Sequence, residues 1–211
     1  MSKDKVLRVS VSQISSYLSY VEGKISLEQF INSMLRRDKP NIKMIAGTIF
    51  HCSIQGLPYE EDSRIEFDTN DLEEARSKVD SRSSIFEYKI RKSYETPRGE
   101  VIVTGVADQI VGDTICEFKT TYSSFSYDRY ADSVQWKAYC SLFGVEMVKY
   151  QVWQITEPEE EEKEERKVLR VKNYNEFTMY SNSCSDFLFR DSLNGAVDLI
   201  YALDLVEAMS I

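Results

Sequence analysis

A short stretch, residues 101–121, limits the fold of this chain more than any other part of its sequence. Two apolar, β-branched runs meet there at Gly112-Asp113. A two-residue loop of this composition is typical of a β-hairpin, because both residues tolerate the left-handed backbone of a primed turn. The loop also sets the register, in which Asp108 lies directly opposite Glu117. The sequence therefore predicts a hairpin that brings two carboxylates to one place.

The facing carboxylates and a nearby lysine give this hairpin its chemistry. Like charges at cross-strand distance repel, so the arrangement favours a cation between Asp108 and Glu117, and oxygen ligands select a hard ion such as Mg²⁺ or Mn²⁺. Lys119 is expected on the same face as Glu117, two residues further along the strand. An ordinary surface ion pair is the alternative, because the Glu-x-Lys pattern also occurs at 87–89 and 161–163.

The charge of the chain argues against general affinity for nucleic acid but permits a local basic groove. The 211 residues carry a net charge of −9, and seven glutamates lie in the run at 157–166. Nucleic-acid-binding domains are usually basic, and here Lys and Arg residues cluster at 36–43 and again at 89–98. The acidic run fits either a solvated loop or a mimic of phosphate charge that guards a basic groove.

The length of the chain favours one domain, residues 1–211, with a substantial core. No apolar run is long enough to cross a membrane, and the first residues lack a signal-peptide pattern, so we expect a soluble intracellular protein without membrane contact. The cysteines stand far apart in the sequence, which indicates core thiols rather than a zinc site or a disulfide framework. They are Cys52, Cys116, Cys140 and Cys184.

The N-terminal part, residues 10–60, has the apolar spacing of helices. Helices are predicted at 10–37, with a break near Gly23, and at 42–55, where Gly47 and His51 share one face. His51 is the only histidine of the chain, and a lone histidine is more often a structural residue than a ligand. The expected N-caps are Ser12 for the first helix and Asn70 or Asp71 for a short helix at 70–80.

A sheet is predicted across residues 85–172. A strand at 85–93 turns through 96–99 into the hairpin and gives three antiparallel strands, and a later strand at 147–155 is expected to pair with 167–172. The tail at 173–211 has the pattern of two helices interrupted near Asn194-Gly195.

A helix is predicted between the hairpin and the later strands, at 127–143, ending at Gly144 as a C-terminal cap. Gln135 and Tyr139 lie four residues apart on it and share a face. Taken alone, this pair indicates an ordinary helix surface.

Taken together and in order, four motifs resemble the RecB-type branch of the PD-(D/E)XK nucleases, which includes phage exonucleases and CRISPR-associated iron–sulfur nucleases. Residues 10–17 are similar to its N-terminal serine and tyrosine motif, and 47–51 to its Gly-x-x-x-His. Residues 105–108 with 117–119 are similar to its core signature, and 135–139 to its Gln-x-x-x-Tyr. The resemblance covers about residues 10–155 and implies an α/β fold with a central mixed sheet flanked by helices.

The resemblance also implies roles for individual residues. Asp108, Glu117 and Lys119 would form the catalytic site, and the metal would be held by His51, both carboxylates and the backbone carbonyl of Phe118. Because imidazole is softer than carboxylate, Mn²⁺ is expected to be favoured over Mg²⁺. Gln135 and Tyr139 would position DNA. The family's group of three cysteines is missing here, so no iron–sulfur cluster is expected, and the C-terminal helices are expected to brace the domain instead.

The function that follows is a Mg²⁺- or Mn²⁺-dependent deoxyribonuclease, an exonuclease that acts on DNA ends in recombination, replication or DNA degradation. The expected location is the cytoplasm of a bacterial or phage-infected cell, and the expected partners are DNA, other copies of the chain, or a recombination or replication protein. Two alternatives stay open: a catalytically idle nuclease fold that binds DNA ends or serves assembly, and a nuclease that acts on RNA.

Overall fold

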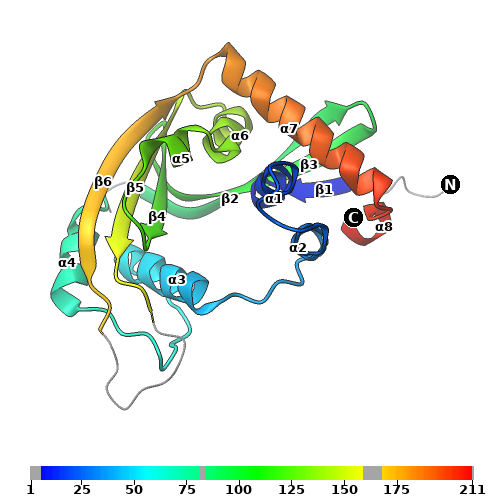
Figure 1. Cartoon of the computed structure of the whole chain (residues 1–211). Coiled ribbons are helices and arrows are strands. Elements are labelled where there is room, and N and C mark those ends of the chain that lie inside the picture. Colours follow the sequence, from blue (N-terminus) through cyan, green and yellow to red (C-terminus); the bar gives the residue numbers. More distant parts are fainter. Residues whose placement is uncertain (1–5, 81–83, 159–167, 211) are drawn as a thin grey trace.

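A computed structural model describes residues 6–80, 84–158 and 168–210. Within these ranges the chain is an α/β protein with a mixed six-stranded sheet flanked by helices, as predicted (Figure 1). The strand order is β1-β3-β4-β5-β6, and β2 pairs with β3 as well. The strands are β1 (Leu7–Ser10), β2 (Ser84–Thr96), β3 (Gly99–Val111), β4 (Thr114–Thr121), β5 (Met147–Ile155) and β6 (Val171–Tyr180).

The predicted hairpin is present, and its register leaves an opening in the sheet. β3 and β4 pair in the predicted register from Val111–Thr114 to Gln109–Cys116, where the ladder stops. β1 pairs in parallel with residues 101–104 of β3, and β2 pairs along nearly all of β3. Because β2 occupies one edge of β3, β1 and β4 must share the other edge. Residues 105–108 therefore have no paired strand on that edge.

Helices cover both faces of the sheet and bury two main apolar clusters (Figure 1). The larger cluster lies between the sheet and α1, α2, α6 and α7, and the smaller lies between the sheet and α3 and α4. The helices are α1 (Val11–Val21), α2 (Leu27–Met34), α3 (Ile42–Gln55), α4 (Thr69–Ser77), α5 (Tyr127–Ala131), α6 (Val134–Phe143), α7 (Ser183–Ala202) and α8 (Val206–Met209).

Several predicted elements are confirmed, with corrections at their ends. The helix at 42–55, the strand at 147–155 and the three consecutive antiparallel strands are all present. The first helix is capped by Ser10 rather than by Ser12, because Gln13 completes a capping box with Ser10. Asp68 caps α4 in place of the predicted Asn70 or Asp71. The Asp71 side chain instead accepts a hydrogen bond from the Val171 amide.

The long helix predicted at 127–143 is two helices, with a break at Asp132-Ser133. Lys137 explains why the break is tolerated: its ammonium donates to the carbonyls of Ala131, Asp132 and Ser133 at 3.0 to 3.3 Å. The Trp136 indole donates to the Ala131 carbonyl as well. Backbone acceptors that a continuous helix would satisfy are thus taken by side chains. The predicted end at Gly144 is confirmed, with φ of 69°.

The N-terminal strand and the tail differ most from the sequence-based expectation. β1 was not predicted, and the partner of β5 begins at Val171 instead of near 167 and runs to Tyr180, so 175–180 are strand rather than helix. The tail does not break at Gly195, since α7 passes through it. A side chain there would collide with the Tyr17 hydroxyl, so this glycine serves the packing of α7 on α1.

The acidic run falls almost wholly outside the described residues, which exclude 159–167. Its first residue, Glu157, forms an ion pair with Lys43 at the start of α3. The helices of the described ranges include none long and apolar enough to cross a membrane.

Candidate active site at the opening of the sheet

Asp108 and Glu117 meet at the point where β3 and β4 separate. The Asp108 carboxylate accepts a hydrogen bond of 2.7 Å from the Phe118 amide on β4. In return, the Asp108 amide lies 3.4 Å from Glu117 Oε1. Each residue therefore reaches the other strand where the regular ladder has ended, which confirms that they are cross-strand neighbours. The Asp108 side chain occupies the position that a backbone carbonyl would take in a continuous ladder.

Glu117 is buried and pairs with a partly exposed lysine. Its side chain is 1% exposed, and Oε2 accepts from Lys119 Nζ at 2.9 Å. Burial raises the pKa of Glu117, the negative charge of Asp108 raises it further, and the charge of Lys119 opposes both. Burial lowers the pKa of Lys119, but the two carboxylates outweigh it and the net direction is upward. The site thus brings two acids and one cation close together, and the raised pKa of Glu117 favours its protonated form.

Two side chains from α6 close one side of the opening. Gln135 donates to Glu117 Oε2 at 3.0 Å and to the Tyr139 hydroxyl at 3.2 Å. The Tyr139 hydroxyl donates to the Val106 carbonyl at 2.8 Å, which satisfies an acceptor in the unpaired part of β3. The pair predicted to share a helix face therefore lies at the carboxylates and does more than cover the surface.

His51 approaches the same place from the other face, on α3. Gly47, one turn earlier, makes this approach feasible, because a Cβ there would lie 3.0 Å from Thr120 Oγ1 on β4. The His51 ring lies 6.2 Å from the Phe118 ring, centroid to centroid. Its Nε2 is buried and has no hydrogen-bond partner among the described residues.

The His51 imidazole is neutral at physiological pH. Burial lowers its pKa to about 4, with the charge of Asp108 opposing the shift and the charge of Lys119 adding to it. A neutral ring with a free nitrogen lone pair is the form that binds metal ions.

Glu87 and Gln55 also belong to this site, although their roles were not predicted. Glu87 follows Phe86, which pairs with Gln109, so it stands beside Asp108 on β2. Its pKa is raised by burial and then by the charge of Asp108. Gln55 donates to the Asp108 carbonyl at 3.2 Å, while its own Oε1 is buried without a partner. The Glu-x-Lys pattern at 87–89 is the sequence signal for Glu87. Taken only as a second occurrence of the hairpin's pattern, it did not predict a position beside the hairpin.

Glu87 has a left-handed backbone, with φ of 51°. Residues an even number apart normally share a face of a strand. Here Phe86 packs in the cluster beneath α3 and α4, whereas Ile90 packs in the larger cluster on the opposite face. The left-handed residue between them lets β2 change face at the carboxylates.

The donor set fits a hard divalent ion with one nitrogen ligand. His51 Nε2 and Gln55 Oε1 are buried acceptors that lack partners, which is costly in a folded protein unless something else binds them. The two carboxylates add anionic oxygens, of the kind that Mg²⁺ and Mn²⁺ prefer. The side chains now contact one another in pairs, and no three His, Cys, Asp or Glu side chains of the described ranges form a group ready to hold an ion.

No protein-family model and no curated protein matches this chain. Among solved structures, the crystal structure of SSO0001 is similar, with a TM-score of 0.54 and 13% sequence identity. The likeness covers 93% of this chain and 78% of that chain. At this identity it shows a shared fold and carries no information about activity.

Proposed function

We propose that this protein is a metal-dependent nuclease of the PD-(D/E)XK type that hydrolyses DNA phosphodiester bonds, with an exonuclease that trims DNA ends as the preferred form. One observation carries the proposal: the buried Glu117, paired with the partly exposed Lys119, stands beside Asp108 at an opening in the sheet, and the unpartnered nitrogen of His51 faces it. Buried charges that are only partly compensated are typical of catalytic sites. The similarity to SSO0001 supports the fold alone.

The residues that would hold Mg²⁺ or Mn²⁺ are His51, Asp108, Glu117 and the backbone carbonyl of Phe118. When bound, such an ion polarises the scissile phosphate and lowers the pKa of a coordinated water. The protein supplies a neutral imidazole, because burial keeps His51 unprotonated, and carboxylate oxygens that are fixed by the hydrogen bonds described above.

Lys119 would act on the charge that develops at the phosphate. Its ammonium is held at 2.9 Å from Glu117 and remains protonated, since the two carboxylates raise its pKa. A positioned cation in a site that excludes water stabilises a developing anion more strongly than an exposed one. Gln135 would keep the Glu117 carboxylate oriented and, together with Tyr139, line the path of the DNA strand.

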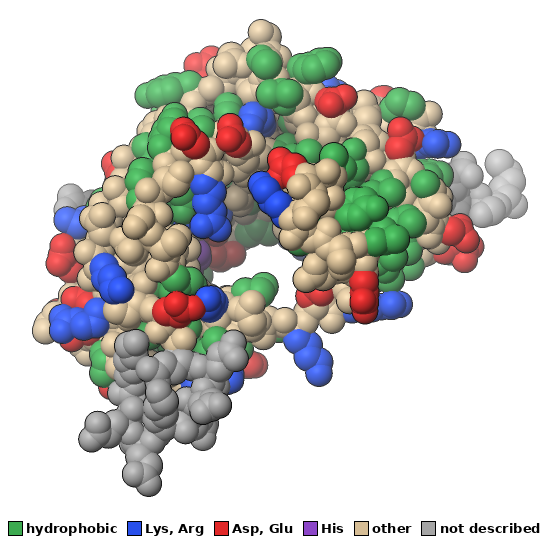
Figure 2. Space-filling model, in the orientation of Figure 1, with side chains coloured by type: hydrophobic (Ala, Val, Ile, Leu, Met, Phe, Trp, Pro, Cys, Tyr) green, Lys and Arg blue, Asp and Glu red, His purple; other side chains and the backbone are tan. Residues whose placement is uncertain are grey.

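Figure 2 shows the space that a strand would enter. The molecule is hollowed near its centre, with Lys and Arg side chains and some acidic side chains at the rim, and the histidine, drawn in purple, lies beside acidic side chains on the wall. A cavity of about 640 Å³ opens beside this region and includes Gln135 and Tyr139 in its lining. The Arg8, Arg36 and Lys89 side chains that line this cavity agree with local DNA binding by a chain whose net charge is −9.

Cleavage of labelled DNA tests the proposal. Single- and double-stranded DNA carrying a 5′ or a 3′ label would be incubated with Mg²⁺, Mn²⁺ or Ca²⁺, and the products sized. We expect stepwise shortening from an end, inhibition by Ca²⁺, and higher activity with Mn²⁺ than with Mg²⁺ at equal low concentration. Binding without cleavage under every metal would favour the idle DNA-end-binding module, and cleavage of RNA alone would favour the ribonuclease.

A metal-preference measurement sharpens the role of His51. Replacing the imidazole by a carboxylate in His51→Asp removes the nitrogen ligand, so the advantage of Mn²⁺ over Mg²⁺ should narrow. Ser53→Ala on the same helix is a control, because the Ser53 hydroxyl only donates to the Ile49 carbonyl. Full activity of His51→Asp with an unchanged preference would remove His51 from the site.

A further inference from the structure

The cavity beside Gln135 and Tyr139 has an unusual charge. Its lining includes Arg8, Arg36 and Lys89 and contains no acidic residue. None of these three cations forms an ion pair with a carboxylate within the described part of the chain, whereas Arg64, Arg98, Arg170 and Arg190 all do. Arg36 and Lys89 are exposed, so three cations around one cavity are free of carboxylate partners and available to bind an anion. We call this cavity the basic pocket.

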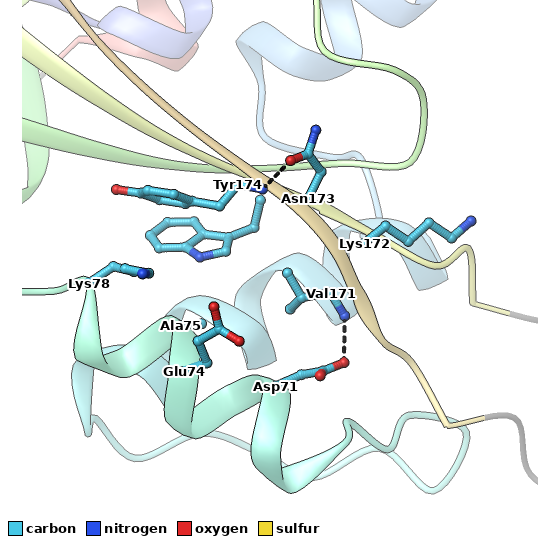
Figure 3. A pocket seen from close by; sticks show the side chains of 9 residues that line it. Asp71, Glu74, Ala75, Lys78, Val171, Lys172, Asn173 and Tyr174 are labelled. Carbon is cyan, nitrogen blue, oxygen red and sulfur yellow. Dashed lines mark hydrogen bonds between the residues drawn. The ribbon is translucent and has the colours of Figure 1, made fainter.

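A second cavity, about 350 Å³ in volume, shows what a compensated pocket looks like. Figure 3 shows it between α4 and β6, where Asp71 and Glu74 share the lining with Lys78 and Lys172. The Asp71 carboxylate already accepts from the Val171 amide and from Arg170. Acidic and basic side chains are equal in number in this lining, so this cavity has no excess positive charge that would attract an anion.

Hydroxyl groups and a helix end add anion-binding capacity to the basic pocket. Ser10, Ser12 and Ser33 line it, and the Ser10 and Ser12 hydroxyls are 2.9 Å apart at the start of α1. The first turn of α1 contains no acidic residue, so no charge neutralises its dipole, although the Ser10 hydroxyl already accepts from the Gln13 amide. Arg8 stands on β1 with its Nε buried and without a hydrogen-bond partner. Together these groups offer the donors that phosphate oxygens accept.

The basic pocket and the carboxylates lie at two ends of the same opening. Gly105 and Val106 line the pocket, and Asp108 follows two residues later on the same unpaired stretch of β3. Two residues of strand span on the order of 6.5 Å. This is similar to the separation of neighbouring phosphates along a DNA strand, so the pocket lies within reach of a phosphate next to the one at the carboxylates. Gln135 and Tyr139 belong to both places.

We propose that the basic pocket binds a phosphate group of the DNA strand close to the bond that is cut, and so sets where along the strand cleavage falls. This inference rests on the proposed function for the identity of the strand, but the phosphate contact itself is measurable without cleavage. The phosphate is either an internal phosphodiester or a terminal phosphomonoester, and both present the same oxygens to Arg8, Arg36 and Lys89.

Binding of single-stranded DNA tests the pocket. Internally labelled oligonucleotides with 5′-hydroxyl, 5′-phosphate or 3′-phosphate ends would be titrated in EDTA, which prevents cleavage. The test variant is Arg36→Ala with Lys89→Ala, because both side chains are exposed and their removal spares the core. The matched control is Arg37→Ala with Arg91→Ala, which removes two exposed cations from neighbouring positions outside the pocket lining.

We expect the test variant to raise Kd by about tenfold or more relative to the control. The slope of log K against log salt should fall by about 0.7 for each lost phosphate contact. A loss with every oligonucleotide identifies an internal phosphate, and a loss confined to one phosphorylated end identifies a terminal phosphate. Arg8→Gln should weaken binding in the same way.

Equal affinity of the test and control variants overturns the inference, whether both keep wild-type binding or both lose it. The same oligonucleotides with Mn²⁺ separate this outcome from failure of the proposed function. Absence of cleavage together with pocket-dependent binding would reject the nuclease and keep the phosphate site. If the test variant cleaves DNA at the same position and binds it with the same affinity as the control, the phosphate site alone is rejected.

Discussion

Two carboxylate–lysine pairs of this protein have the same geometry and different electrostatics. Glu117 Oε2 lies 2.9 Å from Lys119 Nζ on β4, and Glu176 Oε2 lies 2.9 Å from Lys149 Nζ, which joins β6 to β5. The pKa of Glu117 is raised, whereas the pKa of Glu176 is lowered. The distance between acid and base therefore does not distinguish the candidate site from an ordinary structural contact.

The surroundings of the two acids explain the difference. The Glu176 side chain is 40% exposed, and although burial raises its pKa, hydrogen bonds from Tyr174, Lys149 and Gln151 lower it further than burial raises it. Glu117 is 1% exposed and has a second carboxylate, Asp108, beside it. A carboxylate whose hydrogen bonds are satisfied stabilises the fold. A carboxyl group buried beside another one destabilises it, and such groups are typical of functional sites.

The largest expected contrast between the two pairs is in cleavage. Lys119→Ala should lower the rate of DNA cleavage by about 10² to 10³, because one donor to the developing charge is lost. Lys149→Ala removes a lysine with the same carboxylate distance and should leave the rate nearly unchanged. Single-turnover rates with saturating DNA and Mn²⁺ measure both. Similar losses in the two variants would place the chemistry elsewhere.

The pH dependence of stability should also distinguish the candidate site from the Glu176–Lys149 contact, because only the site contains a histidine. In metal-free protein the unfolded histidine binds a proton below its ordinary pKa of 6.5, but folded His51 does so only near 4. Between these values the unfolded state holds more protons, so stability falls as the pH falls, by up to about 3 kcal/mol.

Urea denaturation of wild-type and His51→Gln protein from pH 7 to pH 4 measures this loss. Glu117 contributes the opposite slope, because a carboxyl group with a raised pKa stabilises the fold on the acidic side and loses that contribution as the pH rises. Taking the difference between the two proteins isolates the histidine. Parallel curves would show that the ring is accessible to protons in the folded state.

Gln151→Leu should lower the free energy of unfolding more than Gln135→Leu does. Gln151 is 2% exposed, and its amide reaches the Lys78 carbonyl, the Tyr174 hydroxyl and Glu176. Leaving these groups without a donor should cost about 1 to 3 kcal/mol. Gln135→Leu should instead lower cleavage with a smaller change in unfolding free energy. The comparison fails if both variants lose equal stability.

The smallest expected effect is a gain in stability at Glu87. Its left-handed backbone costs a non-glycine residue about 1 kcal/mol, so Glu87→Gly should raise the unfolding free energy by a similar amount. Glu95→Gly, at an exposed position of the same strand, should lower it. Differential scanning calorimetry of the two variants provides the measurement, and a loss at both positions would show that no strain is stored at Glu87.

The sequence patterns predicted correctly those elements whose structure depends on residues close together in the chain. The loop at Gly112-Asp113 set the register of β3 and β4, and α3 begins and ends where its periodicity does. Asp108, Glu117 and Lys119 could be placed together because a tight hairpin leaves one register. The parallel pairing of β1 with β3 was missed, since four residues beside a charged segment carry no readable period.

Other errors came from contacts between residues distant in sequence. Gly195 reads as a helix breaker, but its role is to make room for Tyr17 on another helix. The break at Asp132-Ser133 depends on the carbonyl contacts of Lys137, which no propensity encodes. Glu87 was seen as a motif, but its place beside Asp108 follows from the pairing of β2 with β3.

The close approach of Gly47 to Thr120 also bears on the order of folding events. β2, β3 and β4 are consecutive antiparallel strands, so they can pair through local turns, whereas α3 must dock on β4 across a long intervening segment. Long-range contacts close late, because loop entropy must be overcome first. We expect α3 amides to gain hydrogen-exchange protection after those of the hairpin during refolding. The carboxylates would then be assembled before the imidazole arrives, and the proposed nuclease activity would appear only with the last step.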